Sequence, residues 1–249
     1  MRMTDRRLIL LALLSATGGI AQADPLTDLI GKAAPGAFTG PGRLPTTITP
    51  REGQDGLKQA LTKGAIAAVA HVGKLDGYWA DGQIRIPLPG ALGSLQRTLK
   101  GVGLSGPLDD LHLRVNRAAE TAAPKARGLF TRAISTMTIE DVAGVLRGGD
   151  TAGTQYLKNR TGSQLETLFH PPMKQALEGS GAMKALRSVS AQQGLDRFMS
   201  GDPADNLTRF AVAKGLDGLF YYVGMEESAI RRDPVKQTTG LLKKVFGAL

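Results

Sequence analysis

The sequence contains no cysteine, so disulfide bonds, thiol nucleophiles and lipid attachment through a cysteine are all excluded. Aromatic residues are scarce, at 5% of the chain, and the core must therefore be built mainly from Leu, Ala and Val with close helix contacts at glycine and alanine. Long apolar runs are also missing after the N-terminus, whereas a membrane-spanning helix needs about 20 apolar residues. We expect a soluble mature chain that does not span a membrane.

The N-terminus has the three parts of a secretory signal peptide. A basic stretch precedes an apolar run over residues 8–14, and residues 21–23 form an Ala-Gln-Ala cleavage site. We therefore expect residues 1–23 to be a signal peptide cleaved after Ala23, and the mature protein to work in a bacterial periplasm. The alternative is that the apolar run belongs to a buried N-terminal helix.

The chain is basic, with 31 Lys and Arg against 22 Asp and Glu, a formal net charge of +9. Cleavage after Ala23 removes three arginines and one aspartate, which leaves a net charge of +7. A basic protein of the cell envelope favours anionic partners such as lipid headgroups, lipopolysaccharide or acidic polymers. The basic residues are scattered and form no stripe with interleaved aromatics, so we expect no nucleic-acid partner.

The predicted organisation is a Pro/Gly-rich arm over residues 24–52 followed by a helical domain over residues 53–249. Five of the thirteen prolines fall in the arm, where they prevent a long helix. In the helical domain, apolar residues recur at helical spacing. Alternation around Asp81-Gly82 predicts a short hairpin. The expected fold class is all-α: a single helical domain with one small β-hairpin near residues 78–86 and an irregular N-terminal arm.

Local signatures of catalysis are absent or lack the required context. Residues 101–106 match G-x-G-x-x-G but follow a helical pattern, which favours a turn between helices over a nucleotide site. Asp109, Asp110 and His112 suggest a metal site, but acidic residues at a helix start explain them better. His71 and His170 have no carboxylates grouped beside them in sequence. We expect no cofactor and no metal, and the sequence assigns no catalytic residue.

Six polar residues make up a candidate binding cluster: Asn116, Arg117, Glu120, Asp150, Thr154 and Tyr156. The first three lie within two turns of a predicted helix. The last three follow the glycine pair at residues 148–149, where a loop could line a pocket. The alternative is a structural network between helices.

Two further pairs occur late in the chain. Glu227 and Arg231 are i,i+4 neighbours, a spacing that contributes only tenths of a kcal/mol when the pair is exposed. Tyr221 and Tyr222 follow one another, so they cannot share one helix face, and one of them is expected to edge a cavity or a partner surface.

The chain resembles a family of exported bacterial proteins known only as domain of unknown function 4197. The resemblance is carried by Ile86-Pro87-Leu88-Pro89, Asn116 to Glu120, Met137-Thr138-Ile139, Asp150-Thr151-Ala152, Tyr156, Gly218-Leu219-Phe220, Glu226-Glu227, Ile230-Arg231 and Leu241 to Phe246. It covers nearly all of the chain from about Leu57. Gly153 departs from the family pattern, which has alanine there, and this implies a looser helix start. The resemblance implies a periplasmic helical protein and brings no known activity, so it transfers no catalytic residues.

Three functions follow as hypotheses. The first is a non-enzymatic periplasmic protein that binds an apolar or anionic envelope ligand, such as a lipid, or a partner protein. The second is a hydrolase acting on an envelope polymer, with Glu120 or Asp150 as the acting carboxylate and Arg117 nearby in an open cleft. The third is a helical scaffold that oligomerises through its final amphipathic helix, at residues 241–249.

Overall fold

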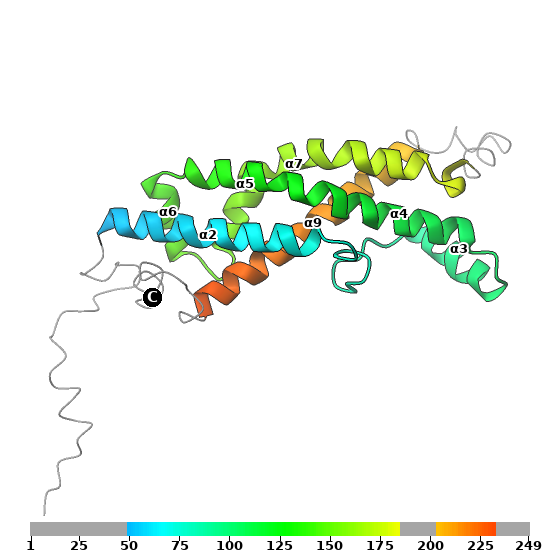
Figure 1. The fold of residues 1–249 in the computed structure, drawn as a ribbon, viewed down its shortest axis with the longest axis horizontal. Helices are drawn as coiled ribbons and strands as arrows, with labels where there is room; N and C mark the ends of the chain where they lie inside the picture. The colour runs from blue at the N-terminus through cyan, green and yellow to red at the C-terminus, as the bar shows by residue number, and fades with distance from the viewer. Residues whose placement is uncertain (1–48, 185–202, 233–249) are drawn as a thin grey trace, which may run out of the picture. The chain divides into compact units, whose positions relative to one another are not determined.

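The structure is a computed structural model that describes residues 49–184 and 203–232 (Figure 1). These residues belong to one compact unit, residues 40–249. The predicted signal peptide, the arm up to residue 48 and the predicted amphipathic helix at residues 241–249 lie outside the described residues.

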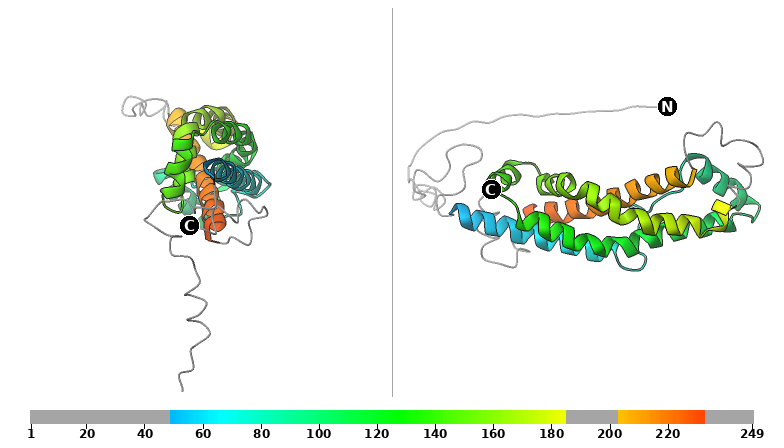
Figure 2. Two further views of the ribbon diagram at one scale, coloured as in Figure 1. Left: turned by 90° about the vertical axis from the view of Figure 1, so that its left-hand side faces the viewer. Right: turned by 90° about the horizontal axis from the view of Figure 1, so that it is seen from above.

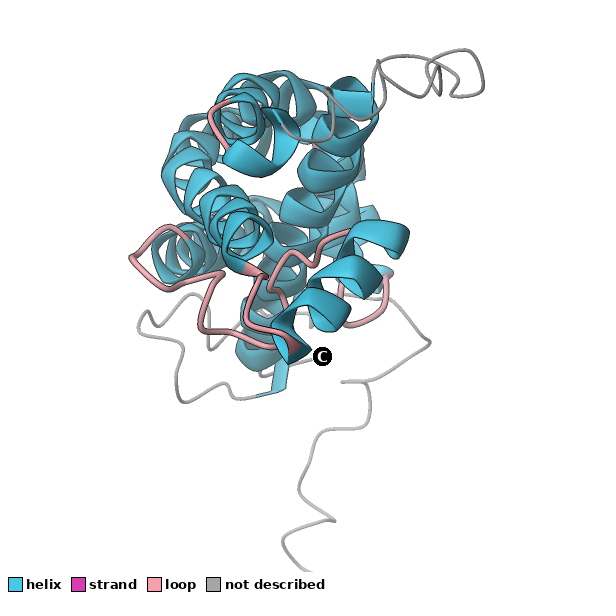
Figure 3. Cartoon of the chain, turned by 90° about the vertical axis from the view of Figure 1, so that its right-hand side faces the viewer, coloured by secondary structure: helices cyan, strands magenta, loops and turns pink. Residues whose placement is uncertain are grey.

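The described part of the chain is all-α, as the sequence predicts, and contains no strand (Figure 3). Its α-helices are α2 (Pro50–Val72), α3 (Gly90–Gly101), α4 (Gly106–Ala122), α5 (Ala126–Ser135), α6 (Ile139–Arg147), α7 (Ala152–Glu178) and α9 (Pro203–Arg232). A short 3-10 helix, η1 (Ala123–Lys125), joins α4 to α5. Pro124 lies in this 3-10 turn, where the missing N–H of proline ends the hydrogen-bond ladder of α4.

Helix α2 begins three residues earlier than the predicted start of the helical domain at residue 53. Thr49 and Glu52 form a capping box, in which each side chain accepts the backbone N–H of the other residue. Pro50 follows at the first helical position, where its missing N–H costs nothing. The last residues of the predicted arm are therefore the first turn of a helix.

Helix α9 lies between α2 and α7 and makes its most extensive contacts with these two helices (Figures 1 and 2). Helices α4 and α5 pack against α7, and α5 also packs against α2. The α2–α9 contact is close because α2 has a glycine there: a Cβ at Gly64 would lie 3.3 Å from the Cβ of Glu226. Small residues thus set the helix spacing, as the composition predicts.

The predicted hairpin at residues 78–86 is absent, and residues 73–89 form a series of turns instead. The alternation in the sequence nevertheless has a counterpart in burial, because Ile84 and Ile86 are buried while Arg85 between them is exposed. The backbone groups that a hairpin would pair across two strands are bonded elsewhere. Side chains of α4 accept the N–H groups of Tyr78 and Ile86, so the segment packs on a helix as a loop.

Candidate functional site

The six residues of the predicted binding cluster do not meet at one pocket. Asn116, Arg117 and Glu120 hold the loop of residues 73–89 on α4. Arg117 also lines a groove that reaches Pro172 on α7. Thr154 precedes Pro172 by 18 residues in the same helix, which is about 27 Å along its axis. The two halves of the predicted cluster therefore lie apart.

Glu120 holds the start of the loop. One carboxylate oxygen accepts the backbone N–H groups of Tyr78 and Trp79 at 3.1 and 3.0 Å, and the other accepts Nη1 of Arg117 at 2.7 Å. Arg117 in turn bonds Asp76 at 2.7 Å. Glu120 is 5% exposed, so its carboxylate is buried and both of its oxygens accept hydrogen bonds from within the protein. These hydrogen bonds and ion pairs join the loop to α4.

Tyr78 anchors the same loop on α9. Its side chain is fully buried, and its hydroxyl donates to the carbonyl of Gly215 at 2.6 Å. Burial is the main reason that the pKa of this phenol rises far above its usual value, and the charge of Glu120 adds to the shift. A Cβ at Gly218 would lie 2.8 Å from the Tyr78 ring, so glycine is required for this approach. The loop is fixed by contacts on two helices.

The solvent side of the loop presents Trp79 and Arg85. The Arg85 guanidinium lies 4.9 Å from the centroid of the Trp79 ring, and its Nε donates to the carbonyl of Trp79. His112 of α4 packs edge-on against the indole, with ring centroids 5.0 Å apart. Desolvation is the main cause that lowers the pKa of His112, and the charge of Arg85 acts in the same direction. Nε2 of His112 is buried and has no hydrogen-bond partner in the described structure.

A second contact ties the loop to α9. The hydroxyl of Tyr222 donates to Asp81, and the imidazole of His71 stacks on the Tyr222 ring at a centroid distance of 4.1 Å. His71 thus lies near a carboxylate in space, although none is grouped beside it in sequence. Tyr222 is the tyrosine of the pair that packs against this loop, while Tyr221 is 43% exposed. The sequence does not predict this cluster because Asp81 and Tyr222 are 141 residues apart.

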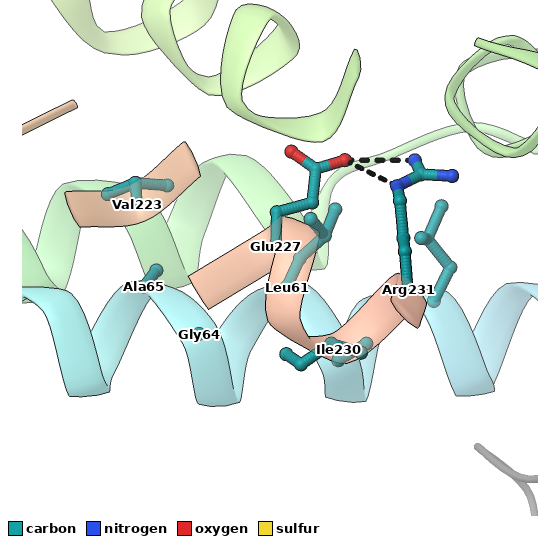
Figure 4. Close-up of a pocket in the computed structure, with 9 residues that line it drawn as sticks. Leu61, Gly64, Ala65, Val223, Glu227, Ile230 and Arg231 are labelled. Atoms are coloured by element: carbon teal, nitrogen blue, oxygen red, sulfur yellow. Dashed lines mark hydrogen bonds and ion pairs between the residues drawn. The ribbon is translucent and has the colours of Figure 1, made fainter. Parts of the chain in front are cut away.

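The second network lies at the start of α7. Glu227 of α9 accepts the backbone N–H groups of Gly153 and Thr154 at 2.9 and 2.7 Å, and the Thr154 hydroxyl at 2.8 Å. Arg231 bonds the same carboxylate through Nε and Nη2 (Figure 4). Glu227 therefore caps the N-terminus of α7, where a negative charge is favourable.

Glu227 is buried and Arg231 is largely covered, with side chains 5% and 11% exposed, so the rule for solvent-exposed i,i+4 pairs does not apply to this pair. Gly153, where the sequence predicts a looser helix start, has its N–H bonded to Glu227, and an added Cβ would come too close to a methyl group of Leu61. A cavity of about 10 Å³ lies between Leu61 and the pair, which is room for one water molecule (Figure 4).

The last two residues of the predicted cluster, Asp150 and Tyr156, contact other residues near the start of α7. Asp150 is exposed and bonds Arg232 at 2.8 Å, which lowers the pKa of its carboxyl. The Tyr156 hydroxyl lies 3.3 Å from Asp141 and 3.4 Å from the carbonyl of Ala133. Tyr156 thus joins the start of α7 to α5 and α6.

Two open grooves are large enough for small molecules. One, of about 640 Å³, lies between α7 and α9, and the other, of about 540 Å³, lies between α4 and α7.

Nowhere in the described ranges do three His, Asp or Glu side chains gather as metal ligands would. Asp109 instead accepts bonds from Ser105 and Gln96, and Asp110 pairs with Arg114. Among residues 49–184 and 203–232, no helix has the length and apolar character needed to cross a membrane.

Comparison with known proteins places the chain in a family. The family model described as protein of unknown function (DUF4197) matches residues 47–247, and the chain belongs to this family. This confirms the resemblance seen in the sequence. No curated protein and no solved structure matches the chain.

Proposed function

We propose that this DUF4197 protein is a non-enzymatic binding protein of the bacterial periplasm that captures an anionic envelope component at Trp79 and Arg85. The predicted N-terminal signal peptide supports export, and the net charge of +7 that its cleavage leaves favours anionic partners. The observation that carries the proposal is the placement of Arg85. Its exposed guanidinium is held over an aromatic ring on a loop that buried contacts fix in place.

Arg85 has the features of an anion-binding arginine. Its Nε is bonded to the Trp79 carbonyl, and no carboxylate of the described residues pairs with it. The two Nη atoms are therefore left for a phosphate or carboxylate group, which the planar guanidinium binds through two parallel hydrogen bonds. Stacking on the indole holds the side chain in one place, so little conformational entropy is lost on binding.

The loop is rigid enough to serve as a platform. Tyr78 and Ile86, on either side of the exposed residues, are both buried and hydrogen-bonded to α4. His112 of α4 packs edge-on against the indole of Trp79 and helps to hold it in position. Binding residues are often carried on loops that a rigid scaffold holds in position.

The other hypotheses receive less support. An apolar ligand held inside the protein would need more space than the cavity of about 10 Å³ beside Glu227. The hydrolase hypothesis needs Glu120 or Asp150 in an open cleft near Arg117. Glu120 is instead saturated with hydrogen bonds, and Asp150 pairs with Arg232. The oligomerisation hypothesis depends on residues 241–249, and their deletion, with the oligomer size as the readout, tests it.

Trp79 is the single tryptophan of the chain, so its fluorescence reports on this site alone. We expect a saturable change in emission when the mature protein is titrated with vesicles containing phosphatidylglycerol, and none with phosphatidylcholine vesicles. Inorganic phosphate as a second titrant separates free phosphate from a lipid headgroup.

Arg85→Gln should weaken the response about tenfold or more, because it removes the bidentate contact. Arg127→Gln is the matched control, since Arg127 is an exposed arginine of α5 and the substitution changes the net charge equally. Equal effects of the two variants would mean that general charge attraction alone causes binding, and the proposal would be wrong.

A further inference from the structure

Helix α7 contains two adjacent prolines in its interior. Pro171 and Pro172 lie well before the end of the helix at Glu178. Proline has no N–H, so the carbonyls of Thr167 and Leu168, four residues earlier, lack their usual helical partners. Two hydrogen-bond acceptors are therefore left without their i+4 donors in the middle of the helix.

The groove between α7 and α9 is located at this point. Its volume of about 640 Å³ is within the range typical of small-molecule sites. It is lined by Glu166, Thr167, His170 and Pro171 of α7 and by Arg209, Val212 and Ala213 of α9. Thr167, whose carbonyl lacks its usual helical partner, and Pro171, which lacks the N–H, both border the groove. Pro172 borders the separate groove between α4 and α7.

The two walls of the groove carry opposite charges. Glu166 is exposed on α7 and has no ion pair within the described structure. Arg209 is exposed on α9 and uses one nitrogen to bond the side chain of Asn206 at 2.7 Å, which leaves its other donors for a ligand. Val212, which is 4% exposed, and Ala213 add apolar surface to the lining.

We infer that this groove binds a short peptide with free termini. The amino terminus is recognised by Glu166 and by the Thr167 carbonyl, whose i+4 helical donor is missing at Pro171. The terminal carboxylate is recognised by Arg209. Apolar side chains of the peptide lie on Val212 and Ala213. A simple anion would meet Glu166 unfavourably, and a simple cation would meet Arg209 unfavourably, so the pair of charges favours a zwitterion.

The inference is tested by calorimetric titration of the full mature protein with trialanine, N-acetyl-trialanine and trialanine amide. We expect trialanine to bind, and each blocked peptide to bind at least tenfold more weakly, because each has lost one terminal charge. Absence of heat with trialanine, or equal binding of all three peptides, would overturn the inference.

Proline substitutions separate binding from folding. Pro171→Ala restores an N–H that can bond the Thr167 carbonyl, so this variant should have a higher Tm and yet bind trialanine at least fivefold more weakly. Pro172→Ala is the matched control: it restores the bond to Leu168 and should raise Tm with no change in trialanine affinity. Equal trialanine affinities of the two variants would contradict the role of the Thr167 carbonyl.

Glu166→Gln and Arg209→Gln should each weaken trialanine binding about tenfold or more. Each variant should also abolish the discrimination against the peptide that lacks the matching terminus. Retained discrimination in both variants would contradict the assignment. Arg85→Gln should leave trialanine binding unchanged, so the anion site and the peptide groove can fail independently.

Discussion

Asn116 and Ile86 exchange two hydrogen bonds across 30 residues of sequence. The Ile86 N–H donates to Oδ1 of Asn116 at 2.8 Å, and Nδ2 of Asn116 donates back to the Ile86 carbonyl at 3.0 Å. Both residues are buried, with 0% and 1% of their surface exposed. A single side chain on a helix thus satisfies the backbone groups that a neighbouring strand would otherwise pair.

Asn116→Ala should destabilise the protein by about 2–4 kcal/mol, because it leaves a buried N–H and a buried carbonyl of Ile86 without partners. The measurement is the free energy of unfolding from urea denaturation, followed by circular dichroism. Asn159→Ala, at an exposed position of α7, should change this free energy by less than about 0.5 kcal/mol. Equal effects of the two variants would show that the exchange with Ile86 contributes nothing.

The Asn116–Ile86 exchange also explains how far the fold could be predicted. Helical spacing and proline positions predicted an all-α chain, because these signals act within a few residues. The alternation within residues 78–86 is visible in the burial of Ile84 and Ile86 on either side of the exposed Arg85. It could not predict the hydrogen-bond partner, since a helix side chain and a second strand satisfy the same backbone groups. The hairpin prediction failed for that reason.

The same limit applies to the candidate site. Asn116, Arg117 and Glu120 act on one loop, and their spacing within one helix predicted that they work together. Thr154 joins Glu227 across 73 residues, a contact that no local pattern predicts. The i,i+4 spacing of Glu227 and Arg231 was visible in the sequence, but their burial depends on the packing of α9 against α2 and α7. Long-range packing therefore decides which polar pairs matter.

Glu227→Ala should lower the free energy of unfolding by about 3–5 kcal/mol. The substitution removes the carboxylate that the largely covered Arg231 pairs with and the acceptor of two N–H groups at the start of α7. Asp110→Ala is the matched control, because Asp110 forms an i,i+4 pair with Arg114 at the surface, with side chains 42% and 50% exposed. The control should cost about 0.5 kcal/mol or less. A similar loss in both variants, measured by urea denaturation, would contradict the capping role of Glu227.

Tyr222 and Asp81 should make stability depend on pH. Desolvation raises the pKa of Asp81, but hydrogen bonds from Tyr222 and Gln83 and the charge of His71 outweigh it, so the pKa is lowered. The hydrogen bond to Asp81, followed by desolvation, raises the pKa of Tyr222 to about 12. The lowered pKa means that the stabilisation is present above the unfolded value of about 3.9 and is lost as pH falls through the folded value. The raised pKa of Tyr222 means that the stabilisation is also lost as pH rises through about 12, where the Tyr222 hydroxyl ionises.

Tyr222→Phe keeps the ring that stacks on His71 and removes the hydroxyl that bonds Asp81. At pH 7 the variant should be less stable than the wild type by about 1 kcal/mol, a modest value because the pair is partly exposed to solvent. Urea denaturation at a series of pH values should show this difference shrinking as pH falls below about 4 and Asp81 becomes protonated, at a lower pH in the wild type than in the variant, because the Tyr222 hydroxyl helps to lower its pKa. Tyr221→Phe, at the neighbouring exposed position, should match the wild type at every pH. A Tyr222→Phe difference that stays constant down to pH 2 would mean that the Asp81 carboxylate does not contribute, and that the lost stability comes from packing alone.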